Sequence, residues 1–151
     1  MLIGDYFPLL IHVQPAELTE SAVRDMAASF DTYFARGERY AVLTLSPKDA
    51  VRPGAKERKR VADWVNSPRV KECTKRLCVG SATVTTGGAL ERGMLTALLW
   101  LWRPPFPLQA FGEVPAALDY ALARLEESAV PLPRPKSEIR RQVLERLREL
   151  V

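Results

Sequence analysis

Few side chains in this sequence have the chemistry expected of a catalytic site. The chain has one histidine, His12, and two cysteines, Cys73 and Cys78, among 151 residues. A metal site built on nitrogen and sulfur needs several converging ligands, and these three residues do not supply such a set. The cysteines are not spaced as Cys-x-x-Cys, and no Gly-x-Ser-x-Gly motif accompanies the histidine. We therefore expect a protein that is not an enzyme, with no catalytic residue, no metal and no cofactor.

The junction Thr85-Thr86-Gly87-Gly88 is a candidate anion site. It joins an apolar strand to a helix, and the free N–H groups and the dipole of a helix N-terminus can hold an anion. No Gly-x-x-x-x-Gly-Lys-[ST] or Gly-x-Gly-x-x-Gly motif is present, so a tight turn is the alternative for Thr86, Gly87 and Gly88. Four carboxylates could also lie at strand ends: Asp5, Glu17, Asp49 and Glu113. Their spacing in the sequence does not single out any two of them as a pair.

Positive charge is concentrated between Lys48 and Arg76. This segment holds ten basic and four acidic residues, a net charge of +6, whereas the rest of the chain carries −2. A solvated helix face, an acidic protein partner and nucleic acid are three interpretations of this excess. The sequence has no helix-turn-helix signature, which disfavours nucleic acid. Arg58 and Arg60 are therefore candidate contacts to an acidic protein, because surface charge steers encounter.

Aromatic residues and prolines are concentrated around residues 100–107. An aromatic pair beside an arginine is typical of an interface anchor. Trp102, Arg103 and Phe106 are therefore candidate partner contacts, with burial in the core as the alternative.

Apolar runs and helical periodicity alternate along the chain. Strands are expected at Phe7–Val13, Tyr40–Leu45, Leu77–Thr85 and Leu108–Phe111. Helices are expected at Glu17–Arg36, Ala55–Lys75, Ala89–Trp102, Val114–Glu127 and Ser137–Val151, the second interrupted or kinked at Asn66-Ser67-Pro68. This alternation predicts an α/β fold with a mainly parallel four-stranded sheet, helices on both faces and a C-terminal helix.

The end of the chain is predicted to be an amphipathic helix. Residues 1–130 are expected to form the α/β domain, 131–136 a proline-rich linker and 137–151 the helix. Ile139, Val143 and Leu147 form one apolar stripe that must be buried. The stripe either packs on its own domain or pairs with a partner, including a second copy in a homodimer.

No segment predicts export or membrane insertion. The N-terminus lacks a basic region followed by a long apolar run. The longest apolar run, from Met94 to Trp102, is about half of the ~20 residues that span a bilayer. We therefore expect a cytoplasmic protein without a membrane span.

Several segments resemble a known family of bacterial proteins. They are Arg76-Leu-Cys-Val-Gly-Ser, Leu90-Glu-Arg-Gly-Met-Leu-Thr-Ala-Leu-Leu-Trp-Leu, Pro104-Pro-Phe-Pro with Phe111, and Ala116-Ala117-Leu118. With the element order, they resemble the STAS/SpoIIAA-like fold of anti-sigma factor antagonists over residues 7–125. The resemblance implies a non-enzymatic domain that docks other proteins. Regulatory members carry a phosphorylated serine at a strand-to-helix junction. Here that junction holds Ser46 before Pro47 without the expected Asp-Ser pair, so phosphorylation is not carried over.

These observations predict a non-enzymatic protein-interaction or regulatory module of a bacterial cytoplasm. Two other functions stay open. One is an immunity-type antagonist of a toxin, and the other is a small-ligand or lipid-binding domain, which the apolar helix and the Gly87-Gly88 turn suggest.

Overall fold

A computed structural model of the chain describes residues 1–47, 49–85 and 103–150. The predicted helix Ala89–Trp102 lies outside this range. The described strands are β1 (Leu2–Ile3), β2 (Leu9–Val13), β3 (Tyr40–Leu45), β4 (Cys78–Val84) and β5 (Leu108–Phe111). The described helices are α1 (Glu20–Arg36), α2 (Ala55–Val65), α3 (Pro68–Leu77), α5 (Val114–Glu127) and α6 (Lys136–Leu150).

The described strands form a single sheet in the order in which they occur in the chain, β1-β2-β3-β4-β5. Strands β2 to β5 are parallel, which confirms the α/β fold with a mainly parallel sheet. The prediction of four strands is wrong, because β1 adds a fifth that pairs antiparallel with β2. β1 has two residues, which is too short for any periodicity to reveal it.

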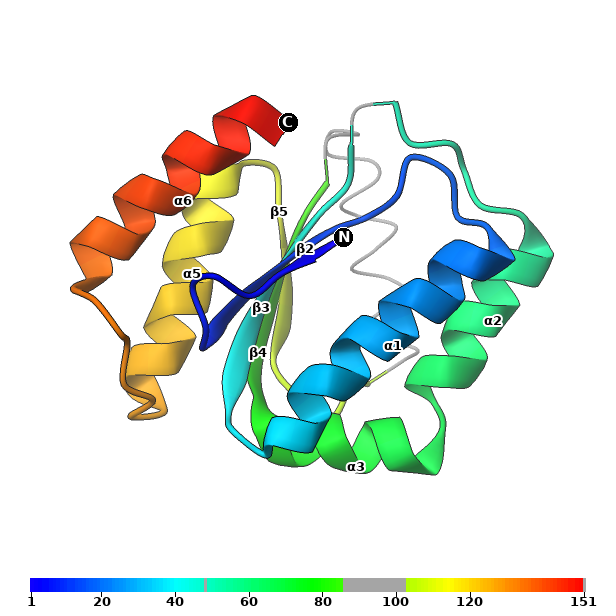
Figure 1. The fold of residues 1–151 in the computed structure, drawn as a ribbon, viewed down its shortest axis with the longest axis horizontal. Helices are drawn as coiled ribbons and strands as arrows, with labels where there is room; N and C mark the ends of the chain where they lie inside the picture. The colour runs from blue at the N-terminus through cyan, green and yellow to red at the C-terminus, as the bar shows by residue number, and fades with distance from the viewer. Residues whose placement is uncertain (48, 86–102, 151) are drawn as a thin grey trace.

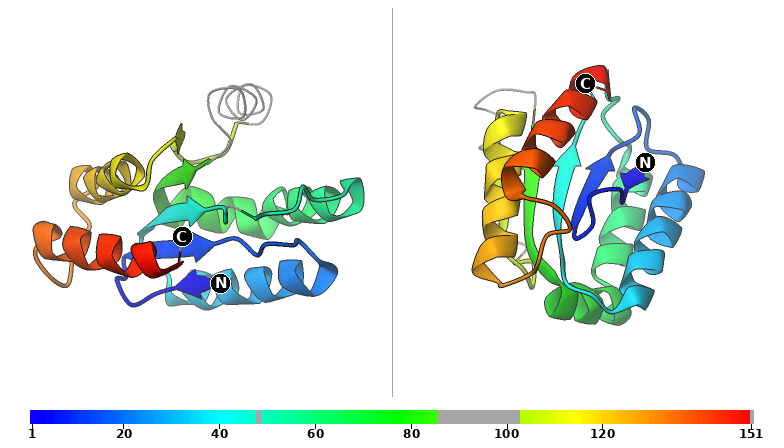
Figure 2. Two further views of the ribbon diagram at one scale, coloured as in Figure 1. Left: turned by 90° about the horizontal axis from the view of Figure 1, so that it is seen from above. Right: turned by 60° about the vertical axis from the view of Figure 1, so that its left-hand side comes forward.

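Different helices cover the two faces of the sheet, as predicted (Figure 1). Seen from above in Figure 2, α5 and α6 lie on one side of the strands and α1 lies on the other, with α2 and α3. Alternate strand residues supply the two cores, because successive side chains point to opposite faces. Leu9 and Leu43 belong to the core that includes Leu118 of α5, whereas Leu10 belongs to the core that includes Phe30 of α1.

Local signals set the ends of α1 and the break after α2. Thr19 caps α1 and accepts a hydrogen bond from the Ala22 N–H. Gly37 ends it in the left-handed conformation, with φ of 65°. The predicted interruption at Asn66-Ser67-Pro68 is a complete break between two helices, and Pro68 occupies the first turn of α3. Since α3 continues to Leu77, β4 begins one residue later than predicted.

Helix α6 packs on the same core as the sheet. It begins at Lys136, one residue before the predicted start at Ser137, and the Pro135 carbonyl accepts from the Glu138 and Ile139 N–H groups. Two arginines of α6 bind carboxylates elsewhere in the fold. Arg140 donates to both oxygens of Asp119 in α5, at 2.6 and 3.1 Å, and Arg146 pairs with Asp5 beside β1.

Candidate binding surfaces

Six polar side chains from three neighbouring strands share one face at the carboxyl end of the sheet. We call this set the polar floor; its members are His12, Gln14, Thr44, Ser46, Thr83 and Thr85. His12 pairs in register with Thr44, and Thr44 pairs with Thr83. Gln14, Ser46 and Thr85 each follow two residues later and therefore lie on the same face.

The amino half of this face is mostly apolar, and the buried Ser81, in register with Val42, is its polar exception. Leu10 and Val42, two residues before His12 and Thr44, belong to the core under α1 and α3. One hydrogen bond crosses the polar floor between neighbouring strand ends: the Ser46 hydroxyl donates to Gln14 Oε1 at 2.7 Å. The same face of the sheet therefore changes from apolar packing to hydrogen-bonding groups along the strands.

The His12 ring is buried and uncharged at neutral pH. Its residue is 7% exposed, and Phe30 of α1 lies edge to face with it, with ring centroids 5.6 Å apart. Burial, with a smaller contribution from the nearby N-terminal ammonium, lowers the pKa of His12 to about 4. Within the described residues, neither His12 Nε2 nor Thr85 Oγ1 has a hydrogen-bond partner, although both atoms are buried.

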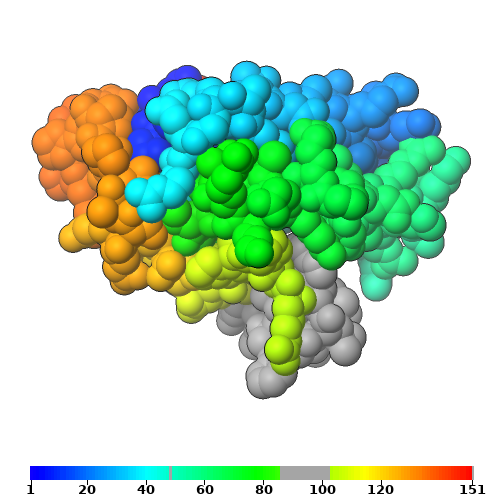
Figure 3. Space-filling model, turned by 90° about the horizontal axis from the view of Figure 1, so that it is seen from below, coloured from blue at the N-terminus to red at the C-terminus, as the bar shows by residue number. Residues whose placement is uncertain are grey.

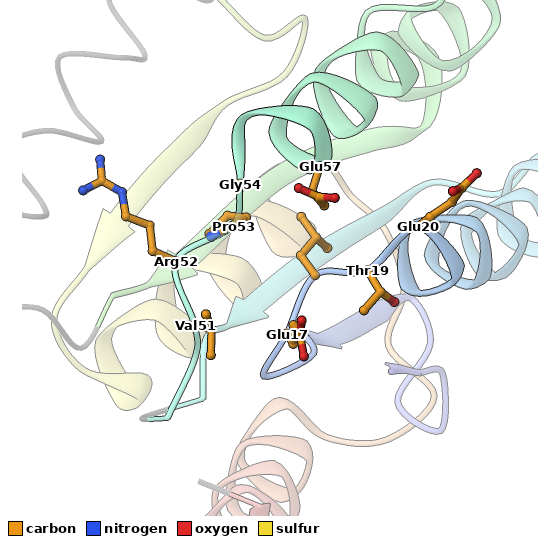
Figure 4. Close-up of a pocket in the computed structure, with 9 residues that line it drawn as sticks. Glu17, Thr19, Glu20, Val51, Arg52, Pro53, Gly54 and Glu57 are labelled. Atoms are coloured by element: carbon orange, nitrogen blue, oxygen red, sulfur yellow. The ribbon is translucent and has the colours of Figure 1, made fainter.

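A cavity of about 270 Å³ lies between the loops that follow β2 and β3 (Figure 4). The Val51 N–H donates to the Ala16 carbonyl at 2.7 Å and joins these loops. The lining residues come from both loops and from the first turns of α1 and α2: Glu17, Leu18, Thr19, Glu20, Val51, Arg52, Pro53, Gly54 and Glu57.

One carboxylate of this cavity forms an ion pair, and a second lies against the backbone at the start of α2. Glu20 pairs with Arg60 at 2.7 Å, and the Glu57 carboxylate folds back over Gly54 at the start of α2. Of the four carboxylates considered at strand ends, Glu17 lines the cavity and Asp5 pairs with Arg146, while Asp49 is exposed. Glu113 occupies the cap position of α5. The structure therefore does not bring these four residues into one acidic site.

The second candidate surface is basic and belongs to α2 and α3. Figure 3 shows these helices next to each other, with α1 along one side. Arg60 pairs with Glu20 and Arg69 pairs with Asp31 at 2.7 Å, so both hold their helices to α1. Five further cations are exposed and form no ion pair with any described carboxylate. We call these five the basic surface: Lys56, Arg58, Lys71, Lys75 and Arg76.

The predicted aromatic contact site is described only in part. Trp102 lies outside the described residues, as do Thr86, Gly87 and Gly88 of the predicted anion site. Arg103 is exposed. Phe106 is half-buried and packs against the core cluster that includes Leu10.

The apolar stripe of α6 lies inside the fold. Ile139 and Val143 are 0% exposed, and Leu147 belongs to the same cluster as the sheet residues Leu9 and Ile11. The stripe therefore packs on its own domain. The large apolar side chains that are exposed in the described ranges are Met1, Val51 and Leu150.

The cysteines are free thiols in different environments. Cys73 is half-buried, whereas Cys78 is buried. Burial raises the pKa of the Cys78 thiol to about 12, which keeps it protonated and unreactive at neutral pH. Across residues 1–47, 49–85 and 103–150, no three His, Cys, Asp or Glu side chains are grouped so as to hold a metal ion. Nor, in these ranges, is any helix long and apolar enough to cross a membrane.

Sequence reasoning missed the polar floor, although the signal is present. Three strands end with the same pattern of apolar, polar, apolar and polar residues: Ile11-His-Val-Gln, Leu43-Thr-Leu-Ser and Ala82-Thr-Val-Thr. This period of two marks one face of each strand as polar at its carboxyl end. When these strands are considered only as apolar runs, the polar face at their carboxyl ends is not recognised.

The architecture defines the class of protein: an α/β protein with a mainly parallel sheet covered by helices on both faces. No protein-family model, curated protein or solved structure matches the chain.

Proposed function

We propose that this protein is a non-enzymatic interaction module that docks an acidic protein partner through the basic surface. The observation that carries the proposal is the set of five exposed cations on α2 and α3 without a described carboxylate partner. In line with the sequence resemblance, we propose a STAS/SpoIIAA-like fold and a regulatory role in a bacterial cytoplasm. The alternation of strands and helices supports this fold.

The two ion pairs to α1 make the basic surface suitable for docking. Arg60 and Arg69 join α2 and α3 to the same helix, so the remaining cations extend from a fixed support. Clustered charge of one sign raises association rates by roughly 10- to 1000-fold, and the effect falls steeply with ionic strength. Binding through this surface should therefore be fast and sensitive to salt.

The buried reactive groups also favour binding over chemistry. The nucleophile of a cysteine is its thiolate, and the raised pKa of Cys78 disfavours that form. His12 is held under α1 against Phe30, and its buried Nε2 has no bonding partner among the described groups. Neither residue has the surroundings of an activated catalytic group.

Charge reversal tests the proposal. The double variant Lys71→Glu, Lys75→Glu changes the basic surface, and the matched variant Arg141→Glu, Arg148→Glu reverses two exposed arginines of α6. Wild type and both variants are used to capture binders from lysate, in parallel with and without nuclease treatment. The captured protein is identified, purified and titrated against each variant at low and high salt.

We expect to capture an acidic protein that binds the wild type and the α6 variant (Arg141→Glu, Arg148→Glu) with similar affinity. Its affinity should be lower for the α3 variant (Lys71→Glu, Lys75→Glu), and it should fall at high salt. Equal affinity for both variants would overturn the proposal. Binding that disappears after nuclease treatment would also overturn it, in favour of nucleic acid. A captured toxin that is inhibited on binding would identify the immunity-type alternative.

A further inference from the structure

We propose that the polar floor binds a small uncharged molecule with several hydroxyl groups, of the polyol or sugar class. This site is separate from the basic surface and does not depend on the proposed docking function.

The position of the polar floor favours ligand binding. In open α/β sheets, ligands bind outside the carboxyl ends of the strands, usually where the strand order reverses; here β2 to β5 follow one another without a reversal, so the rule indicates only which end of the sheet is favoured. The polar floor occupies this end on three adjacent parallel strands, with His12, Thr44 and Thr83 in direct register. The cavity between the β2–α1 and β3–α2 loops lies at the same end of the sheet, and its lining residues do not include the members of the polar floor.

The buried imidazole supplies an independent observation. Burying a polar atom without a hydrogen bond is costly, and most buried polar atoms in proteins have a partner. His12 is 7% exposed, yet its Nε2 has no partner among the described residues, and the same is true of the buried Thr85 hydroxyl. Both groups lie on one face at one end of the sheet and lack a partner in the described part of the chain, which a ligand that bonds to them would explain.

The chemistry of the polar floor selects an uncharged ligand. Its four hydroxyls, one amide and one neutral imidazole can each donate and accept hydrogen bonds, and none is ionised at neutral pH. A charged ligand would lose its hydration there, and none of the six side chains of the polar floor carries a charge to compensate. Three carboxylates, Glu17, Glu20 and Glu57, also line the neighbouring cavity. They face two arginines, Arg52 and the Arg60 that pairs with Glu20, so negative charge exceeds positive charge there and disfavours an anion. A molecule with several hydroxyl groups matches these partners.

The single histidine of the chain makes a sharp probe. Full-length protein labelled with ¹⁵N-histidine gives the ring signals of His12 alone. It is titrated with myo-inositol, with D-ribose and, as the charged counterpart, with ribose 5-phosphate. We expect at least one of the two neutral compounds to shift the ring nitrogen signals in a saturable way, and ribose 5-phosphate to bind more weakly than D-ribose.

Two matched substitutions locate the site. Thr44→Val removes a hydroxyl from the polar floor while keeping the shape of the side chain, and Thr32→Val does the same on the exposed side of α1. Loss of one ligand hydrogen bond should weaken binding about tenfold in Thr44→Val and leave Thr32→Val unchanged. If Thr44→Val does not fold, Thr83→Val replaces it.

The wild-type titration alone can overturn the proposal. Ring signals that stay fixed with both neutral compounds would do so, as would a response to ribose 5-phosphate only. Equal weakening by Thr44→Val and Thr32→Val would also reject the polar floor as the site.

Discussion

The imidazole of His12 and the phenyl ring of Phe30 lie edge to face, with centroids 5.6 Å apart and planes inclined by 74°. The contact joins β2 to α1 and shields the histidine from water. Protonation of His12 would bury a charge away from water and near the N-terminal ammonium, which is why its pKa falls to about 4.

The first prediction concerns pH. Well above pH 6.5, the usual pKa of histidine, His12 is neutral in both states and contributes no pH dependence. Between pH 6.5 and 4 the unfolded chain binds the proton more readily, so the free energy of unfolding falls as pH falls. Urea denaturation at pH 7 and pH 5 should show wild type losing about 2 kcal/mol more than His12→Gln. Parallel losses in the two proteins would contradict the low pKa.

The second prediction concerns the packing of α6. Ile139→Ala removes a side chain that is 0% exposed and should lower the free energy of unfolding by about 2–5 kcal/mol. Leu150→Ala, at a position 42% exposed, is the control and should cost less than about 0.5 kcal/mol. The urea midpoint of wild type should not change with protein concentration. A midpoint that rises with concentration would show that the stripe pairs between copies instead.

The third prediction concerns the end of α1. Gly37 has φ of 65°, and its N–H donates to the Phe34 carbonyl. A Cβ at this position would meet no atom within 4 Å, so a substitution is limited by backbone strain and not by a clash. Gly37→Ala should cost about 1 kcal/mol in thermal or urea unfolding, and Gly37→Asn should cost less. Equal stability of wild type and the alanine variant would rule out this cap conformation.

The fourth prediction concerns the thiols. In the native protein a disulfide reagent should modify the half-buried Cys73 first, and Cys78 only when the fold opens. The variant Cys73→Ser should therefore react slowly in buffer and rapidly in urea, whereas Cys78→Ser should keep the fast reaction. Fast modification of Cys73→Ser in buffer would mean that Cys78 is accessible.

Local signals made much of the fold predictable. The apolar runs at Leu9–Val13 and Tyr40–Leu45, the cap at Thr19 and the stop at Gly37 each depend on neighbours in the sequence. The position of the break before Pro68 was also predictable from local residues. Whether the helix is kinked or divided in two was not, because the same residues are compatible with both.

Features that depend on distant pairing were not predictable in this way. β1 exists because Leu2 and Ile3 pair with β2, and two residues carry no period. The polar floor requires the register that sets His12 beside Thr44 and Thr44 beside Thr83. For the α6 stripe, amphipathicity showed that Ile139 must be buried but not against which surface.

The order of the strands has a consequence for synthesis of the chain. The order of β2 to β5 in the sheet is the same as their order in the sequence. Each newly synthesised strand can therefore pair with a strand that left the ribosome before it. The helices that seal the second face, α5 and α6, come last. Until they emerge, Leu43 and Leu45 lack the covering of α5 and α6, so nascent chains that stop before α5 should be the substrates that chaperones bind.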